Sequence, residues 1–505
     1  MASEIRVNKI NSRTGVGTIT LSPTGVDFTG IATVATLKAT TGIVTTLTAT
    51  TGIVTTLTVD TARTTTGIVT TLTADASRIT TGIVTTLTVD TARTTTGIVT
   101  TLTADTAKVG AAVTISESGM EVTGVTTVTS SINIGSATTI SSSSLEVNGV
   151  QYPTAGALSN RNLFINGDQK IDQRNNGSAV SLSSSSPFVT DRWSARINGG
   201  AATGQRVTDV PSGKGFVKSF KFDVTTADTS LGANDEIWLQ QRIEARNLTQ
   251  LRYGTSDAQS VTVSFWVKSA LTGDFGFFVY QSDAARAYQT TYNIATANTW
   301  EYKTITIPGD SSGTINDDAG TGFEIRWYLG VGGNKGGSSN QNAWGTDATN
   351  RHPTGTNIMA STSNNWFITG IQLEVGEKAT PFEHRIVGDE LARCQRYYNM
   401  IANGNSLSIV SGAVYATNNF YSVYNFPVVM RSSPTLDSSS GTNYFDLLSD
   451  GVSDTFNAVL LGNSSANAAE LRAHSNEGLS GATAGHAAWM RTNNSSAYIA
   501  LTAEL

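Results

Sequence analysis

The sequence contains few of the residues on which most enzymes and metalloproteins depend. Its single cysteine, Cys394, excludes an internal disulfide framework and any metal site built from several cysteines. Four separated histidines offer little material for a zinc centre. The motifs GxSxG, GxxxxGK(S/T), GxGxxG and HExxH do not occur, so no catalytic residue, cofactor or metal ligand is assigned.

Long apolar runs and a strong positive charge are also lacking. Without an apolar run of about 18 residues, no membrane-spanning helix is expected. The opening MASEIRVNKI has no apolar segment, so no signal peptide is expected either. Charged residues form only 14% of the 505 residues, and the net charge is −6. A nucleic-acid partner is therefore not expected, because phosphate binding needs clustered lysine and arginine.

A 15-residue repeat is the clearest positive feature. Gly52, Gly67, Gly82 and Gly97 begin successive units, such as GIVTTLTADASRITT. Apolar and threonine residues alternate within each unit, and a polar turn segment follows, which predicts one strand and one turn per unit. The repeats predict a β shaft over residues 42–109.

One copy of this shaft cannot bury enough apolar surface to fold alone. Ordering the backbone of one unit costs about 15–30 kcal/mol, whereas burial of its few apolar side chains returns at most about 10 kcal/mol. Repeats of this kind stack or intertwine. Because the repeats contain few large side chains, a thin homotrimer of intertwined chains is favoured. The alternative is a disordered threonine-rich linker.

The rest of the chain divides by composition. Residues 110–159 continue the strand pattern as a transition, residues 160–387 form a jelly-roll or β-sandwich domain, 388–399 a short helix, and 400–505 a smaller β domain. In the helix, Cys394 is expected to be a buried small hydrophobe. The clearest sandwich strands are expected at residues 261–268, 276–281, 302–307, 323–329 and 366–375.

Alternation assigns faces to the last two of these strands. In one, Phe323, Ile325, Trp327 and Leu329 share a face. In the other, the shared face is expected to carry Phe367, Ile371, Leu373 and Val375. Trp327 and Trp366 are therefore expected in the core, as is Trp193, whereas Trp266 could face either way.

A long polar loop over residues 330–355 provides the candidate binding residues. Loops of this length in a compact domain are functional or disordered. An exposed Trp344 could lie flat on a sugar ring, with Asn342, Asp347 and His352 bonding hydroxyl groups. The alternative is that Trp344 packs against the edge of the sheet. The carboxylates of Asp317, Asp318, Glu374 and Glu377 are expected to be solvated near turns rather than to form a hydrolytic pair.

Several motifs together resemble the tail fibres of phages, especially cyanophages. They are the N-terminal ASEIRVNKINSRTGVGTITLSPTGVDFTGIATV, then RNLFINGDQKIDQRNNG, TDRW, VSFWVKS, FITGIQLEVGEKATPFEHR and GDELARCQRYYNM in that order, and finally NFPVVMRSSPTL. The middle region resembles carbohydrate-binding-module jelly rolls, some of which hold a structural calcium. Gln169 and Lys170 depart from the usual Phe-Glu of those modules, so no calcium is assigned.

The resemblance implies an all-β, elongated homotrimeric fibre with a triple β-spiral-like or β-prism-like shaft. Residues 1–41 would attach to a tail protein (baseplate, nozzle or adaptor), and the C-terminal domains would bind host lipopolysaccharide or polysaccharide. Such a protein is assembled in the host cytoplasm, belongs to the virion and is not an enzyme. The alternatives are a tailspike-type depolymerase and a purely structural fibre. A bacterial adhesin is disfavoured by the missing export signal.

Overall fold

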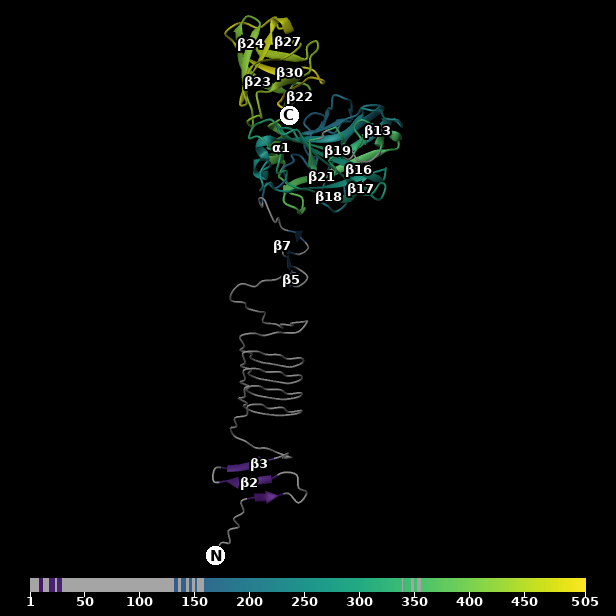
Figure 1. Cartoon of the computed structure of the whole chain (residues 1–505). Coiled ribbons are helices and arrows are strands. Elements are labelled where there is room, and N and C mark those ends of the chain that lie inside the picture. The colour runs from purple at the N-terminus through teal and green to yellow at the C-terminus, as the bar shows by residue number, and fades with distance from the viewer. Residues whose placement is uncertain are drawn as a thin grey trace. The chain divides into compact units, whose positions relative to one another are not determined.

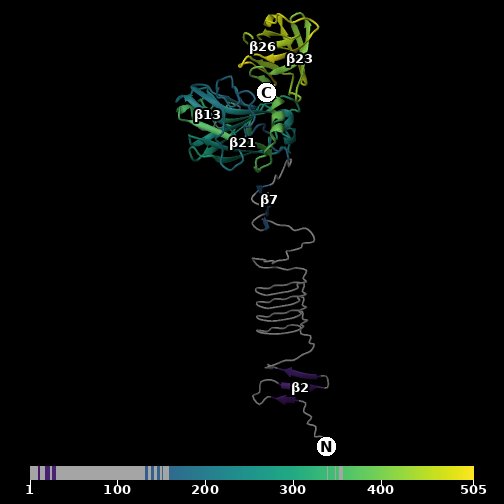
Figure 2. The same ribbon diagram turned by 180° about the vertical axis from the view of Figure 1, so that it is seen from behind.

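The structure is a computed structural model in which the chain divides into two units, Met1–Thr126 and Thr127–Leu505. It describes residues 9–11, 18–22, 25–29, 131–134, 138–141, 145–147, 150–151 and 159–505, except 338, 347–348 and 352–355. The predicted repeat shaft lies outside these residues. Figures 1 and 2 show the labelled elements from opposite sides.

Two small antiparallel sheets precede the larger domains. The described strands of the first unit form a sheet of order β1-β2-β3, and the second unit begins with a sheet of order β5-β6-β7-β8. Their bounds are β1 Lys9–Asn11, β2 Thr18–Ser22, β3 Gly25–Thr29, β5 Ser131–Ile134, β6 Thr138–Ser141, β7 Leu145–Val147 and β8 Val150–Gln151.

The middle domain is a β-sandwich of two antiparallel sheets, as predicted. One sheet has seven strands in the order β10 (Phe188–Thr190), β11 (Trp193–Arg196), β14 (Glu236–Glu244), β19 (Thr321–Val331), β16 (Gly273–Gln281), β17 (Arg286–Ile294) and β20 (Trp344–Gly345). The other has six, in the order β18 (Glu301–Ile307), β15 (Val261–Ser269), β21 (Asn365–Val375), β13 (Ser219–Thr226), β12 (Ala201–Val207) and β9 (Val180–Ser181). The short 3-10 helices are η1 Ala245–Asn247, η2 Thr249–Leu251 and η3 Ile358–Ala360.

The core of the sandwich lies between the two sheets and is rich in aromatic rings. Trp193, Trp327 and Trp366 are each 0% exposed, which confirms the predicted core tryptophans. All five strands predicted by alternation are present, as β15, β16, β18, β19 and β21. The predicted inward face of β19 is also confirmed, because its four apolar residues all belong to this core.

The predicted face of β21 is wrong at one end. The core contains Ile371 and Leu373, but on the N-terminal side it contains Trp366 and Ile368 instead of Phe367. The register of β21 against β15 shifts at this point, and Gly370 has a φ of +63°. A bulge of this kind reverses the alternation. The bulge therefore turns Phe367 to the outer face of the sheet. There the centre of the Phe367 ring lies 6.2 Å from the centre of the Trp300 ring.

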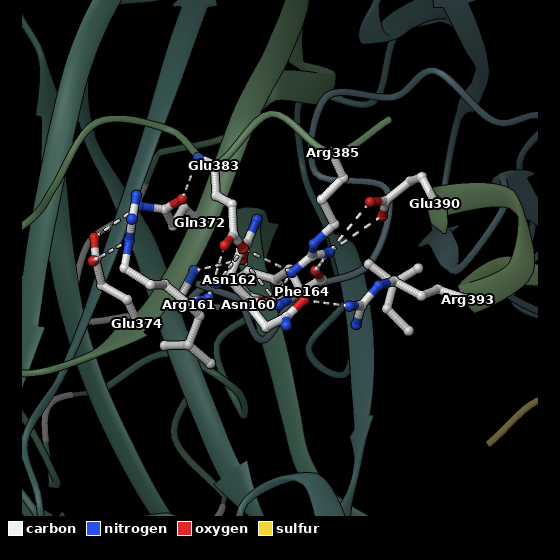
Figure 3. Close-up of polar contacts among 12 residues, drawn as sticks. Asn160, Arg161, Asn162, Phe164, Gln372, Glu374, Glu383, Arg385, Glu390 and Arg393 are labelled. Atoms are coloured by element: carbon white, nitrogen blue, oxygen red, sulfur yellow. Dashed lines mark hydrogen bonds and ion pairs between the residues drawn. The ribbon is translucent and has the colours of Figure 1, made fainter. Parts of the chain in front are cut away.

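A polar lock joins the first residues of the sandwich to its last strand (Figure 3). The side chain of Asn162 donates to the carbonyl of Ile371 and accepts from the N–H of Leu373, both at 3.0 Å. Glu383 accepts the N–H groups of Arg161 and Asn162 at 3.1 and 3.0 Å. This end of the sandwich is therefore closed by side-chain bonds in addition to the backbone bonds from Leu163 to Leu373 and from Ile371 to Gly167, of 2.8 and 3.0 Å.

The lock continues into the turn after Phe164 and into the helix α1 (Val387–Gln395). The guanidinium of Arg385 donates to the Phe164 carbonyl at 3.0 Å and lies 3.2 Å from Glu390. In the turn, a Cβ on Gly167 would lie 2.1 Å from the carbonyl oxygen of Ile371, so only glycine fits there.

The helix is shorter than predicted. It ends at Gln395 rather than at residue 399, because Tyr398 already belongs to the extended strand β22. Cys394 is buried as predicted. Burial raises the pKa of its thiol, which disfavours the reactive thiolate.

The C-terminal domain packs a seven-stranded sheet against a three-stranded sheet. Its apolar core includes Phe420 and Phe445 from the larger sheet and Ile499 from the smaller one. The larger sheet has the order β27 (Val452–Phe456), β26 (Phe445–Ser449), β30 (Ala487–Thr492), β23 (Ser408–Ala416), β24 (Asn419–Asn425), β29 (Ala468–His474), β28 (Leu460–Ser464); the smaller has β22 (Tyr398–Asn403), β31 (Tyr498–Thr502), β25 (Thr435–Ser438). The 3-10 helix η4 spans Ser475–Glu477.

A buried carboxylate joins the two domains. Glu244 of the sandwich is 0% exposed and accepts from the guanidinium of Arg396 at 2.6 and 3.0 Å and from the hydroxyl of Tyr397 at 2.9 Å. Arg431 of the C-terminal domain donates to the carbonyl of Ala319 at 2.9 Å. The bonds from Arg396 and Tyr397 satisfy the buried charge of Glu244, as a carboxylate removed from water requires, and the bond from Arg431 is a separate link between the domains.

Candidate functional site

The structure places Trp344 at the edge of the seven-stranded sheet. Its strand β20 pairs with β17, and its indole N–H donates to the Pro308 carbonyl at 2.7 Å. The ring is half-buried and lies 5.7 to 6.2 Å from the rings of Tyr253, Tyr288 and Phe323. These contacts give Trp344 a packing role at the sheet edge, and its sugar-binding role stays a prediction.

The other predicted loop residues are only partly brought together with Trp344. Asn342 is held on β17, because its N–H donates to the Gln289 carbonyl at 2.7 Å and its side-chain oxygen accepts from Thr290 at 2.7 Å. Asp347 and His352 lie outside the described residues, so their predicted roles are untested.

One of the carboxylates expected to be solvated is buried. Glu374 is 2% exposed and accepts the N–H and hydroxyl of Thr380 at 2.8 and 2.6 Å. It therefore anchors the turn after β21, because a buried carboxylate needs donors in place of water. Asp317, Asp318 and Glu377 are exposed, as expected.

The C-terminal domain carries an open pocket beside an exposed tryptophan. Trp489 of β30 is 41% exposed on the outer face of the seven-stranded sheet. Its neighbours in register are Leu448 on β26 and Ser411 on β23, and both line the pocket with it. The cavity volume is about 520 Å³. This size falls within the range of small-molecule sites.

The hairpin between β26 and β27 forms one wall of this pocket. Asp450 and Gly451 have φ values of +58° and +77°, as the two-residue turn of a tight hairpin requires. The turn therefore places Asp450 and Val452 at the wall of the pocket, next to the face of the sheet. Asp450 lies 3.1 Å from Nδ1 of His486, and the side chain of Asp450 is 69% exposed.

The walls of the pocket combine apolar surface with hydroxyl groups. Ser411 and Ser453 are exposed, and Val452 is 60% exposed. Beside Trp489 on the same face of β30, the guanidinium of Arg491 is fixed to Asp446 by bonds of 2.8 Å, and these bonds raise the pKa of Arg491. A flat aromatic ring, hydroxyls and one accessible carboxylate suit a ligand with both C–H and O–H groups, such as a sugar.

Sequence reasoning missed this pocket, although one signal was present. In β30, Ala488 and Met490 are buried, whereas Trp489 between them faces outward. A tryptophan on the polar phase of an alternating strand indicates an exposed ring. The other walls come from Leu448 and Ser411, which are distant in sequence.

Comparisons with known proteins leave the family open. No protein-family model matches the chain, and no curated protein sequence matches it. Among solved structures, the chain is similar to the enzymatically active domain of tailspike protein 4 of bacteriophage CBA120, at 11% identity and a TM-score of 0.24, over 65% of this chain and 38% of that one.

Carbohydrate-binding modules are also among the similar structures. The family 11 carbohydrate-binding module from Clostridium thermocellum, in complex with a β-1,3-1,4-mixed-linked tetrasaccharide, matches at 12% identity and a TM-score of 0.19, over 40% of this chain and 98% of that one. The CBM22-1–CBM22-2 tandem domain from Paenibacillus barcinonensis Xyn10C matches at 10% identity and a TM-score of 0.21. This match covers 66% of this chain and 99% of that one. Likenesses this distant have no weight for function, which we argue from the residues alone.

The described residues were expected to contain neither a membrane-spanning helix nor a metal site. Among the described residues, no helix is both long and apolar enough to cross a membrane. Within the same ranges, no group of three or more His, Cys, Asp or Glu side chains is arranged to hold a metal ion.

Proposed function

We propose that the protein is an adhesion protein of a phage virion, a tail fibre that binds a host-surface glycan through its C-terminal domain. The pocket of Trp489 carries this proposal, because it joins an exposed indole to hydroxyls and one carboxylate. The attachment to the tail through residues 1–41 and the homotrimeric shaft are parts of the same proposal. They are supported by the motifs and repeats of the sequence.

The pocket would bind a sugar through two kinds of contact. The C–H face of a pyranose ring would cover the indole of Trp489, and removal of both surfaces from water stabilises the complex. The carboxylate of Asp450 would accept hydrogen bonds from sugar hydroxyls, which are stronger than those to neutral acceptors. Ser411 and Ser453 can both donate and accept.

Each site would bind weakly, and the trimer would supply the strength. A dissociation constant of about 1 mM corresponds to about −4 kcal/mol. Three linked sites can raise the overall affinity by about two to four orders of magnitude without a new contact. Weak single sites also allow a particle to move over a surface before it is held.

We further propose binding without cleavage. Among the described residues that line the pocket, Asp450 is the only carboxylate. Most glycosidases need two, one as acid and one as base or nucleophile. Incubation with a bound polysaccharide should therefore release no reducing ends. A steady rise in reducing ends would support the depolymerase alternative.

The decisive experiment compares two aromatic residues on the same sheet face. The full chain, Trp489→Ala and Tyr415→Ala are applied to an array of purified bacterial lipopolysaccharides and capsular polysaccharides. Tyr415 is 80% exposed on β23 and does not line the pocket. We expect wild type and Tyr415→Ala to bind the same glycans, and Trp489→Ala to bind about tenfold or more weakly.

Thermal melting of the three proteins separates binding from folding. The exposed Trp489 should be replaceable with an effect within about 0.5 kcal/mol on stability. Equal binding by Trp489→Ala and wild type would refute the assignment of the pocket. Failure of the wild type to bind any glycan of the array would count against the function itself.

A further inference from the structure

The sandwich contains a second pocket that is lined by arginines. It lies on the outer face of the seven-stranded sheet, has a volume of about 270 Å³, and is lined by Arg192, Arg196, Arg242 and Arg326 among others. This volume is close to the lower end of the range of ligand sites. The pocket therefore suits a small part of a larger ligand, such as one residue of a polysaccharide.

The register of three strands builds the floor of this pocket. Ser194 on β11 pairs with Gln240 on β14, which pairs with Arg326 on β19. One step along, Arg196 pairs with Trp238. Side chains on one face of neighbouring strands stand side by side. The sheet therefore presents the guanidinium groups, an amide and a hydroxyl on one surface.

Three of the four guanidinium groups are paired with acidic side chains. Arg192 is paired with Glu504. Arg326 and Arg242 share Glu324, with Arg242 Nε at 3.2 Å from the carboxylate. Four guanidinium groups thus meet two acidic side chains, and Arg242 also donates to the oxygen of Leu505, which lines the pocket, at 2.7 Å.

Arg196 is the arginine without a countercharge. Its Nε donates to the side-chain oxygen of Asn198 at 2.9 Å, and within the described part of the chain it has no ion pair. The side chain is only half-buried. An unpaired, partly accessible guanidinium is available to an anionic ligand, because its planar fork fits a carboxylate with two parallel hydrogen bonds.

The floor also holds a buried donor without a partner. Trp238 is 3% exposed, and its indole Nε1 has no hydrogen-bond partner among the described residues. The guanidinium of Arg326 lies 4.9 Å from the centre of its ring and donates to the Gln240 oxygen at 2.6 Å. A buried unpaired donor is costly, so an acceptor atom on a ligand or water would relieve that cost.

We infer that this pocket binds an acidic sugar residue by its carboxylate. Arg196 would take the carboxylate, while Gln240 and Ser194 would bond the sugar hydroxyls. The ligand class is shared with the proposed function, but the site is lined by the sandwich and by Leu505 and does not involve Trp489. An acidic sugar of a host polysaccharide would thus be bound at a different site from the sugar that covers Trp489.

The test uses sugar pairs that differ only at C6. Binding of D-glucuronate and D-glucose, and of D-galacturonate and D-galactose, to the full chain is measured by saturation-transfer NMR. We expect at least one acidic sugar to bind about tenfold or more tightly than its neutral partner. Equal binding within both pairs would overturn the inference.

Two variants locate the binding. Arg196→Gln removes the unpaired charge and should weaken uronate binding about tenfold or more. The matched control is Arg252→Gln, whose guanidinium is largely exposed, lies 3.8 Å from Asp257 and does not line the pocket. Uronate binding that is unchanged in Arg196→Gln, or equally weakened in Arg252→Gln, would overturn the assignment.

Two measurements on the wild type need no variant. Raising the ionic strength from about 0.01 M to about 1 M shortens the screening length from about 30 to about 3 Å and should weaken uronate binding. Inorganic phosphate at equal concentration should not displace the uronate. Complete displacement would show a general anion site instead, and binding that is insensitive to salt would contradict recognition by charge.

The two proposals fail separately. If only the Trp489 site is wrong, Trp489→Ala binds the array like wild type while Arg196→Gln still loses uronate. If only the arginine site is wrong, the uronate results fail while Trp489→Ala still loses its glycans.

Discussion

The sandwich and the C-terminal domain use tryptophan in opposite ways. Trp193, Trp327 and Trp366 are fully buried between two large sheets, whereas Trp489 is 41% exposed. All four tryptophans lie in or beside strands with regular alternation of apolar and polar residues. The sequence pattern of a strand therefore does not distinguish a buried tryptophan from an exposed one. The difference is the number of covered faces. Where a second large sheet covers the face that carries the aromatic rings, those rings become part of the core. Where no sheet covers that face, the ring stays accessible to a ligand.

The outer face of the C-terminal sheet supports this comparison. Tyr415 and Val423 are 80% and 62% exposed there, in addition to Trp489. In the sandwich, the outer Trp266 is half-buried and lies 5.3 Å from Tyr302, which is 44% exposed. Isolated exposed apolar residues are common, but a group on one face marks a contact surface.

The largest effect should come from the centre of the sandwich. The Trp327 ring lies within 5.8 Å of the rings of Phe164, Trp193, Phe265 and Phe277. Trp327→Ala should reduce the free energy of unfolding of the sandwich by about 3–5 kcal/mol. Urea unfolding checks this. Trp489→Ala in the same assay is the control, and an equal loss in both would break the comparison.

A smaller effect is expected where the two domains meet. Asp191 is 1% exposed and accepts the N–H of Gln173 at 2.9 Å, and the Gln173 side chain donates to the Tyr398 carbonyl of the C-terminal domain at 2.8 Å. Burial raises the pKa of Asp191 to about 6, although Arg174 and Gln173 lower it in part. The folded protein thus holds a proton that the unfolded chain releases near pH 4.

The sign of the pH effect follows from this difference. Between about pH 4 and 6 the folded state binds more protons, so the contribution of Asp191 to stability falls as pH rises, by about 2–3 kcal/mol in total. Glu383 acts oppositely: burial alone would raise its pKa, but the N–H groups of Asn162 and Arg161 and the charge of Arg385 lower it. Its contribution is lost as pH falls.

Asp191→Asn isolates the effect of Asp191, because the contribution of Glu383 cancels between variant and wild type. The stability difference between Asp191→Asn and wild type should change with pH between about 4 and 6, in favour of the variant at the higher pH. Urea midpoints over this range measure it. Parallel curves for the two proteins would show that Asp191 titrates normally.

The smallest effect on stability is expected for Trp344. Its ring is half-buried, between the fully buried tryptophans of the sandwich and the exposed Trp489, so it sharpens the comparison. Trp344→Ala should cost about 1–2 kcal/mol, since the ring is only half-buried. If its role is packing, glycan binding on the array should stay unchanged. Loss of glycan binding at unchanged stability would instead support the predicted loop site.

Strand prediction succeeded where alternation was unbroken and failed at a bulge. The inward face of β19 followed from its sequence because every second residue is apolar. In β21 the register shift at Gly370 could not be read locally, since it depends on pairing with β15. The pocket of Trp489 was missed for the same reason, because cross-strand register brings Ser411 and Leu448 to it.

The most recognisable motifs proved to be structural. Asn162 in RNLFINGD, Glu383 and Arg385 in PFEHR and Glu390 in GDELARC form the polar lock of the sandwich. They supported the resemblance to tail fibres, yet no residue of either pocket's polar face belongs to the lock. The motifs of the lock are therefore structural, whereas the motif TDRW contributes Arg192 to the lining of the arginine pocket.

The lock has a mechanical consequence. The chain enters the sandwich near Asn160 and leaves it through α1, and Arg393 in α1 donates to the side chain of Asn160 at 2.7 Å. Together with Glu383, this contact clamps the entry and exit of the domain to each other. A pull between the two flanking segments would therefore act first on this clamp and only then on the strands of the sandwich.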